Sequence, residues 1–301
     1  MSGVSSAITR YFSYYVDSAR SHIINCLDRC FDPKAAAFYA ELVLRGYDPN
    51  AHVDVLPQSR LIYVCIPKCA STTIKATLSA LSGRRSLPFE EVHKRRYSGF
   101  RSPYQVGPST LCNLAHDAGT LRFSFVRNPY ARLVSAWADK YRNKPLVRGN
   151  SFVDKYLAYR TSSDPALPEG AGVTLSFPDF VRFTTATADR RLDAHWQLQA
   201  DLLDMPGIKL DLIGKVESFD EDFAHVLAHV GAQQPLHTYN SSAHEPWPEY
   251  YSNALAESVY RAYERDFDRL RYPRAISKNH ASVMRDSGRR QSVRRARQAN
   301  L

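Results

Sequence analysis

One short segment of the chain collects side chains that suit the binding of an anion. Residues 66–73 read IPKCASTT and lie between an apolar run at 60–66 and a stretch of helical periodicity at 73–81. A turn between a strand and the start of a helix presents several backbone N–H groups and the positive end of the helix dipole. Lys68 adds a full positive charge, and three hydroxyl side chains follow it. The segment therefore predicts a site for a phosphate or sulfate group.

The phosphate loop of ordinary nucleotide triphosphatases differs from this segment. That loop reads G-x-x-x-x-G-K-[ST], whereas Lys68 precedes the hydroxyl cluster and both glycines are missing. The difference argues against an ordinary ATP or GTP enzyme. A cluster of hydroxyls that only caps a helix is the simpler alternative, and the segment alone leaves it open.

A second strand–turn–helix segment carries an arginine at the corresponding point. Residues 121–126 form an apolar run, Arg127-Asn128-Pro129 ends it, and helical periodicity follows over 130–141. Arg127 is thus expected at the carboxyl end of a parallel strand, where α/β sheets bind their ligands. A guanidinium can donate two hydrogen bonds to one phosphate, and Ser135 follows about two helical turns later. The alternative is that Arg127 only forms a salt bridge at the surface. This alternative has more weight for Arg132.

Together the two segments resemble the paired motifs by which sulfotransferases bind 3′-phosphoadenosine-5′-phosphosulfate (PAPS). They are closest to the carbohydrate, Golgi-type branch, with its chondroitin, dermatan and HNK-1 enzymes and its bacterial relatives. In that family P-K-x-x-S-T binds the 5′-phosphosulfate, and R-[DN]-P-x-x-R-L-V-S-[AS]-[YW] binds the 3′-phosphate. The resemblance implies that PAPS is held by Pro67, Lys68, Cys69, Ala70, Ser71, Thr72, Thr73, Arg127 and Ser135. The chain departs from the usual residues of these motifs at Cys69-Ala70 and at Asn128. Neither departure removes a charged side chain that would bind the donor.

Three later segments continue the resemblance, which covers about residues 60–273. Residues 194–199 resemble the family's H-W-x-x-Q segment, and residues 213–222 resemble I-G-K-x-E-x-[LF]-x-x-D. Residues 260–272 resemble the closing Y-x-x-D-F…Y pattern. The resemblance implies an α/β fold of three layers, similar to P-loop nucleotide triphosphatases, with a central parallel sheet flanked by helices.

The activity implied by the resemblance is transfer of a sulfonate group from PAPS to a hydroxyl of a carbohydrate or glycoconjugate. The product PAP would be released, and Lys68 would stabilise the charge on its phosphate. No metal is expected, because a sulfonate carries less charge than a phosphoryl group. The alternative is a nucleotide-dependent, kinase-like phosphotransferase with an atypical phosphate loop.

The base that accepts the acceptor's proton is the least determined part of the site. His116 is the first candidate, because related enzymes carry a catalytic histidine roughly at that point before the second motif. His93, His195 and Glu217 are the other candidates, and a structural role is the alternative for each.

Acceptor pockets are expected from the loops at 84–120 and 143–175. Four basic residues of the first loop suit an anionic glycan: Lys94, Arg95, Arg96 and Arg101.

Helical and strand patterns divide the chain into three parts. Residues 1–55 are expected to be a helical extension, with helices at 6–31 and 33–44 that pack on the main domain. Residues 56–275 form the predicted sulfotransferase domain, in which strands and helices alternate, as in a parallel sheet covered on both faces. Residues 276–301 are expected to be a basic, disordered tail.

The charge and the cysteine content of the chain limit where the protein is expected and which partners it is expected to bind. The net charge is +10, but Arg274–Leu301 holds eight Lys/Arg and one Asp, so the remainder is nearly balanced and a specific nucleic-acid partner is not expected. Five cysteines with no C-x-x-C pair and no apolar leader predict free thiols in the cytoplasm. Peripheral contact of residues 6–31 with an anionic membrane, at its inner face, is the alternative to packing. The oligomeric state is left open.

Overall fold

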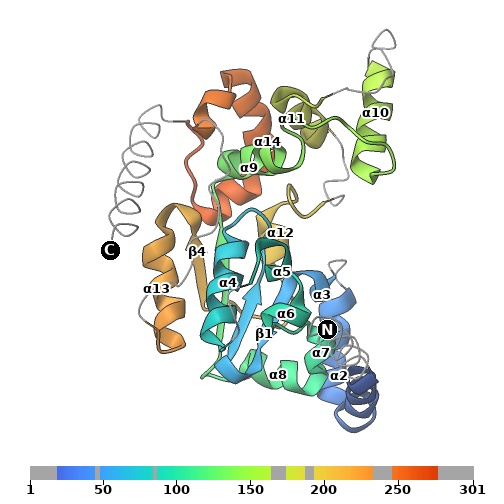
Figure 1. The fold of residues 1–301 in the computed structure, drawn as a ribbon, viewed down its shortest axis with the longest axis vertical. Coiled ribbons are helices and arrows are strands. Elements are labelled where there is room, and N and C mark those ends of the chain that lie inside the picture. Colours follow the sequence, from blue (N-terminus) through green and yellow to red (C-terminus); the bar gives the residue numbers. More distant parts are fainter. Residues whose placement is uncertain are drawn as a thin grey trace, which may run out of the picture. The chain divides into compact units, whose positions relative to one another are not determined.

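The computed structural model describes residues 19–44, 48–83, 87–163, 174–186, 193–232 and 246–276 (Figure 1). The first part of the predicted helix at 6–31 and nearly all of the predicted tail lie outside these residues. The chain forms two units, which we describe one at a time. Met1–Val126 with Asp201–Asn240 make the first unit, and Arg127–Ala200 with Ser241–Leu301 make the second.

A four-stranded, mostly parallel sheet forms the centre of the first unit. Its strands are β1 (Val53–Leu56), β2 (Leu61–Val64), β3 (Leu121–Val126) and β4 (Leu212–Lys215), in that spatial order. β2, β3 and β4 are parallel, which confirms the α/β prediction, whereas β1 pairs with β2 antiparallel. β1 was not predicted, and the predicted boundary after residue 55 falls inside it.

Helices cover both faces of this sheet, so the first unit has three layers. On one face Val53, Val55 and Ile62 pack against α2 (Pro33–Leu44) and α8 (Pro108–His116). On the other face Phe125 packs against Phe219 and Phe223 of α13 (Phe219–His229). α4 (Ser71–Leu81) joins this second face through an ion pair described below. The alternation of side chains along each strand therefore directs apolar groups to two separate helical layers.

The insertion between the two motifs is more helical than expected. The predicted loop at 84–120 contains α5 (Phe89–Val92), α6 (Arg95–Ser98), α7 (Pro103–Val106) and α8. Three of these helices have only four residues, which is too short for a helical period to show in the sequence. A capping box starts α7, since the Ser102 and Gln105 side chains each bond the other residue's backbone N–H.

The second unit is helical and has an aromatic core. It contains α9 (Pro129–Lys140), α10 (Ser151–Ser163), α11 (Phe177–Ala186), the 3-10 helix Trp247–Tyr250 and α14 (Asn253–Leu270). The core includes Trp137, Phe152, Phe180, Trp196 and Phe267. α10 was not predicted. None of the helices in the described ranges is long and apolar enough to cross a membrane.

Candidate active site

The segment between β2 and α4 folds as the kind of turn that binds anions. Lys68 has φ +68° and Ala70 has φ +59°, so two residues with side chains occupy the left-handed region. Each such residue costs roughly 1–2 kcal/mol, so the surrounding fold must impose the conformation. Alternation of right- and left-handed residues turns successive N–H groups toward a common point. Ala70 then begins α4 without a side-chain cap.

Three hydroxyl residues form the first turn of α4, two residues earlier than predicted. Ser71 and Thr73 are buried, Thr72 is partly exposed, and Cys69 is completely buried beneath the turn. Lys68 is partly exposed. The turn thus combines backbone donors, hydroxyl donors, a lysine and the positive end of an 11-residue helix, which together suit a phosphate or sulfate.

A histidine from the insertion reaches this turn. Nε2 of His93 lies 3.0 Å from Oγ1 of Thr72, although 21 residues separate the two in the sequence. His93 follows directly after α5, and its side chain is exposed. The structure therefore brings one predicted candidate base to the predicted phosphosulfate loop.

A buried ion cluster holds the insertion against the sheet beside this loop. Asp54 of β1 is fully buried, and its two carboxylate oxygens lie 2.7 Å from Nζ of Lys75 and 2.7 Å from Nε of Arg95. Arg95 also donates to the carbonyls of Asn50 and Val53. Burial alone would lower the pKa of Lys75, but neighbouring Cys65 and Asp54 raise it above its ordinary value.

This cluster links three elements that the loop depends on. Lys75 belongs to α4, Arg95 lies two residues after His93, and Asp54 anchors both to the sheet. Because its guanidinium is bonded to Asp54 and to two carbonyls, Arg95 has a structural role. We therefore no longer count it among the residues predicted to bind the acceptor. Lys94 and Arg96 are exposed, and Arg96 stacks on the ring of Tyr97 at 4.5 Å.

The structure does not bring His116 to the loop. His116 is the last residue of α8 and lies five positions before the start of β3, whereas Lys68 follows the end of β2. Because β2 and β3 are parallel, these points lie at opposite ends of the strands. The paired part of β2 alone spans about 10 Å. His116 instead has Nδ1 2.7 Å from the Cys112 carbonyl and its ring against Phe38. This placement argues against His116 as the base.

In the second unit, three of the motif segments form one chain of hydrogen bonds. The Gln199 side chain accepts from the N–H of Arg127 at 2.9 Å and donates to its carbonyl at 2.8 Å. Asp266 accepts from the backbone N–H groups of Gln199 and Ala200 at 2.9 and 2.8 Å. Burial raises the pKa of Asp266, against the lowering effect of these bonds. The segments at 194–199 and 260–272 thus fix the backbone of Arg127, whose side chain is partly exposed.

Two further residues of the second motif lie inside the second unit. Arg132 is 1% exposed and donates to the carbonyls of Gln197 and Ala194 at 2.6 Å each. It therefore orders the backbone around Trp196. Ser135 is 3% exposed and lies on α9 among core residues.

His195 belongs to a separate charged cluster of the second unit. Nδ1 of His195 pairs with Oδ1 of Asp193, and Nζ of Lys140 lies 3.5 Å from Oδ2 of the same carboxylate. Burial opposes the charge of Asp193, but His195 and Lys140 lower its pKa to about 2. His195 is thus an oriented, partly exposed histidine, and it remains an alternative base.

The segment at 213–222 has a structural explanation in the first unit. A Cβ on Gly214 would lie 2.6 Å from the Phe125 ring, so only glycine fits there. Asp222 accepts from the N–H of Lys215 and the hydroxyl of Ser218 at 2.6 and 2.7 Å, which closes the turn from β4 into α13. Glu217 in this turn is exposed.

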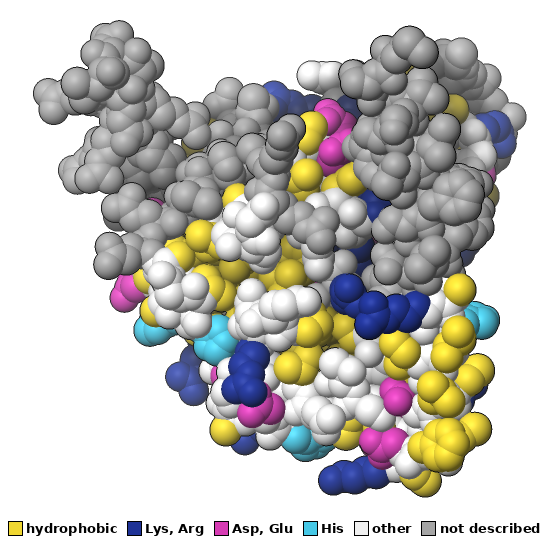
Figure 2. Space-filling model, turned by 60° about the horizontal axis from the view of Figure 1, so that its bottom comes forward, with side chains coloured by type: hydrophobic (Ala, Val, Ile, Leu, Met, Phe, Trp, Pro, Cys, Tyr) yellow, Lys and Arg dark blue, Asp and Glu magenta, His cyan; other side chains and the backbone are white. Residues whose placement is uncertain are grey.

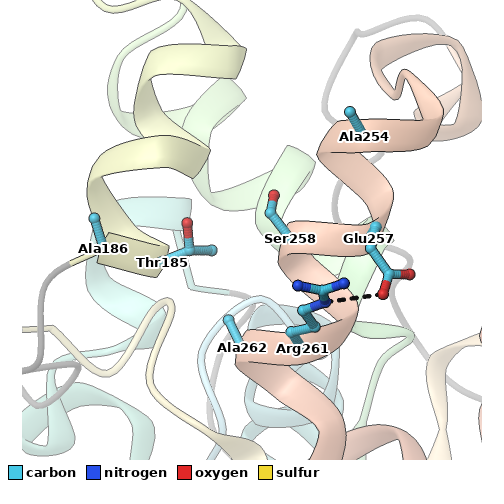
Figure 3. A pocket seen from close by; sticks show the side chains of 7 residues that line it. All are labelled: Thr185, Ala186, Ala254, Glu257, Ser258, Arg261 and Ala262. Carbon is cyan, nitrogen blue, oxygen red and sulfur yellow. Dashed lines mark hydrogen bonds and ion pairs between the residues drawn. The ribbon is translucent and has the colours of Figure 1, made fainter.

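An open pocket of about 520 Å³ lies between α11 and α14 (Figure 3). Thr185 and Ala186 line one wall, and the other wall includes Arg261, which pairs with Glu257 at 3.0 Å. None of the seven lining residues is a predicted site residue. We therefore assign this pocket no part in the reaction.

Sequence reasoning missed the residues that support the site from behind. Asp54 and Lys75 were not singled out, although a lone aspartate in the short apolar run VDVL was a usable signal. The contacts of Gln199 and Asp266 were not foreseen either. Both residues belong to segments that resemble the family's motifs, and that resemblance was the signal by which they could have been found.

Comparison with known proteins gives consistent matches. The profile of the sulfotransferase family matches residues 51–273. Carbohydrate sulfotransferase 11 of Rattus norvegicus is 30% identical over 253 residues, covering 76% of this chain and 69% of that protein. Carbohydrate sulfotransferase 12 of Mus musculus is 27% identical, covering 76% and 61%, and carbohydrate sulfotransferase 14 of Homo sapiens is 28% identical, covering 74% and 60%. No solved structure matches the chain.

Proposed function

The chain belongs to the sulfotransferase family, and from this we propose that it transfers the sulfonate group of PAPS to a hydroxyl of a carbohydrate or glycoconjugate. The family implies PAPS as the donor. The observation that carries the proposal is the loop at 67–73, where two left-handed residues, one of them Lys68, precede a helix start that has no side-chain cap. The carbohydrate acceptor rests on the relatives, which are carbohydrate sulfotransferases by name.

The donor's two charged ends have separate binding residues in this proposal. The loop from Pro67 to Thr73 binds the 5′-phosphosulfate through its N–H groups, its hydroxyls and Lys68. Arg127 binds the 3′-phosphate, and its backbone is already held by Gln199. Ser135 is assigned to the 3′-phosphate by the motif alone, since it is nearly buried.

The reaction requires one new bond and one broken bond at sulfur. The acceptor oxygen bonds to sulfur while the bond from sulfur to the bridging oxygen breaks, and PAP leaves with that electron pair. Lys68 stabilises the negative charge that develops on the bridging oxygen. PAPS supplies the activated sulfonate, and no step in this scheme uses a metal, which stays a prediction.

We assign the base to His93 in place of His116. His93 touches the phosphosulfate loop through Thr72, and the acceptor's proton would pass to its Nε2 atom. Asp54 acts through Arg95 as a positioning residue for this histidine. A cytoplasmic location, inferred from the five cysteines, none of which forms a disulfide among the described residues, completes the proposal.

A radiolabelled transfer assay tests the function. The full chain is incubated with [³⁵S]PAPS and a panel of neutral and acidic polysaccharides and glycolipids, and with [γ-³²P]ATP and Mg²⁺ in parallel. We expect ³⁵S in at least one glycan and no transfer of ³²P. Transfer of ³²P without ³⁵S would instead support the kinase-like alternative.

Exchange of His93 for glutamine tests the base. We expect His93→Gln to lower kcat about 100-fold, because proton transfer by a placed side chain contributes about that much. Affinity for PAP, measured by calorimetry, should stay within about twofold of wild type. The matched control is His116→Gln, which should keep wild-type kcat. Loss of activity in His116→Gln with none in His93→Gln would restore the original assignment.

A further inference from the structure

Helix 19–31 contacts the rest of the first unit through its polar side. Ser21 and Asn25 are each 4% exposed, and Nδ2 of Asn25 donates to the carbonyl of Tyr104 at 2.8 Å. Asp28 accepts from the N–H of Ser109 at 2.9 Å, and Asp32, just beyond the helix, accepts from its hydroxyl at 2.9 Å. The helix is thus docked on α7 and α8 by hydrogen bonds, which reverses the expected orientation of its apolar residues.

The apolar residues of this helix face outward instead. Ile23 is 60% exposed, Leu27 50% and Phe31 81%, and their spacing of four residues places them along one side of the helix. Ala19, Cys26 and Cys30 are exposed on the same side. We call these six residues the outer face: Ala19, Ile23, Cys26, Leu27, Cys30 and Phe31. Hydrophobic side chains gather at the lower right of the surface in Figure 2, on the side where this helix lies.

The outer face is unusual for this protein. Seven large hydrophobic side chains of the described residues are exposed, and three of them belong to the outer face, whereas Val43 and Leu44 lie at the end of α2. The next helix shows the ordinary arrangement, since α2 buries Ala35, Tyr39 and Leu42 in the core of the first unit. A short helix that buries serine and asparagine while exposing isoleucine, leucine and phenylalanine indicates a second apolar partner.

The charges on the helix identify what kind of partner fits. Both acidic side chains of the contact, Asp28 and Asp32, are turned inward and bonded to Ser109. Arg20 and Arg29 are exposed, and Arg20 falls on the same side as the outer face by helical spacing. The outer face therefore has apolar side chains and one neighbouring cation, whereas Asp28, the acid of helix 19–31, is partly buried and bonded to Ser109. That combination matches an anionic lipid surface, which offers an apolar interior beneath negative headgroups.

We propose that the outer face of helix 19–31 binds the surface of an anionic lipid bilayer. The helix lies in the plane of the headgroups, with Ile23, Leu27 and Phe31 inserted and with Arg20 at the phosphates. Such binding is peripheral and reversible, because three inserted side chains contribute far less than a membrane-spanning helix. It would hold the active site close to glycolipid acceptors.

Vesicle sedimentation with the full chain tests this proposal. Vesicles of phosphatidylcholine with 30% phosphatidylglycerol should bind the wild type, and vesicles of phosphatidylcholine alone should bind it much more weakly. The triple variant Ile23→Ser, Leu27→Ser, Phe31→Ser should bind the anionic vesicles more weakly by a factor of at least about 30, because each inserted side chain contributes favourable transfer free energy. Val147→Ser, which removes a 69% exposed side chain in the second unit, is the matched control and should bind as wild type.

A fluorophore on the outer face separates this helix from the basic tail, which would also attract anionic vesicles. Cys30→Ser leaves Cys26 as the one exposed thiol among the five cysteines, since the other three are buried. An environment-sensitive dye on Cys26 should shift to the blue when anionic vesicles are added, and brominated lipids should quench it. Binding through the tail alone would leave the dye unchanged.

Three results would overturn the proposal. The triple serine variant could bind anionic vesicles as tightly as wild type. The wild type could form a dimer in analytical ultracentrifugation, and the triple variant could be a monomer. In that case a second copy of the chain covers the outer face. The dye on Cys26 could be shielded without vesicles, in which case another part of the chain covers it. None of these results bears on the transfer of sulfonate, so the two proposals fail separately.

Discussion

Replacing Lys68 with methionine should lower kcat/KM for sulfonate transfer about 1,000-fold, because a charged donor aimed at developing negative charge contributes about that much. Methionine keeps most of the unbranched stem and removes only the ammonium group. The left-handed backbone at this residue, φ +68°, is equally strained with either side chain, so the fold should not change. The measurement is the rate of ³⁵S transfer from PAPS at subsaturating donor.

A matched exchange elsewhere in the first unit controls for the loss of a positive charge. Lys209 is exposed and lies just before β4, so Lys209→Met should leave kcat/KM within about twofold of wild type, as exposed charges have small effects. Circular dichroism should be the same for both variants. Wild-type kinetics in Lys68→Met would mean that Lys68 does not contact the leaving phosphate.

Replacing Asp54 with asparagine should lower the free energy of unfolding by about 3–5 kcal/mol, because removing one member of a buried ion cluster leaves its partners unpaired. Lys75 is 6% exposed, so its charge has no access to water once the carboxylate is gone. Arg95 would lose its ion pair and keep only its bonds to the carbonyls of Asn50 and Val53, which would loosen the insertion around His93. We therefore expect kcat to fall as well. Urea unfolding followed by circular dichroism measures the first effect.

An exposed pair provides the control for Asp54. Asp179 and Arg182 form an ion pair on α11 in which the side chains are 43% and 64% exposed. Asp179→Asn should therefore change the stability by less than about 1 kcal/mol. Equal effects of the two substitutions would contradict a structural role for the buried cluster.

Local pattern predicted the elements that carry the two motifs. β3 occupies residues 121–126 as expected, and α9 occupies residues 129–140 where 130–141 was expected, because each combines a clear period with a proline or polar boundary. The loop at 67–73 was also located correctly, since a buried strand and a helix flank it. The anion site at this loop stays a prediction from the chemistry of its residues.

Features that depend on distant contacts could not be predicted. β1 contains a charged residue and pairs antiparallel with β2, and only the tertiary partners Lys75 and Arg95 make that aspartate acceptable inside a sheet. The family resemblance favoured His116 over His93, but the direction of the strands decides which histidine reaches the loop. The period of helix 19–31 was correct, yet a period alone does not say which face docks.

Calorimetric comparison of PAP with AMP tests the central claim most directly, because the two ligands differ only in the 3′-phosphate. Wild type should bind PAP about 100-fold more tightly than AMP, since charge-assisted bonds to one phosphate contribute about 1.5–3 kcal/mol each. Arg127→Ala should remove that preference, while Lys68→Met should weaken both ligands and keep the preference. Failure of wild type to bind PAP, or a preference that Arg127→Ala leaves intact, would contradict the assignment of this chain's donor site.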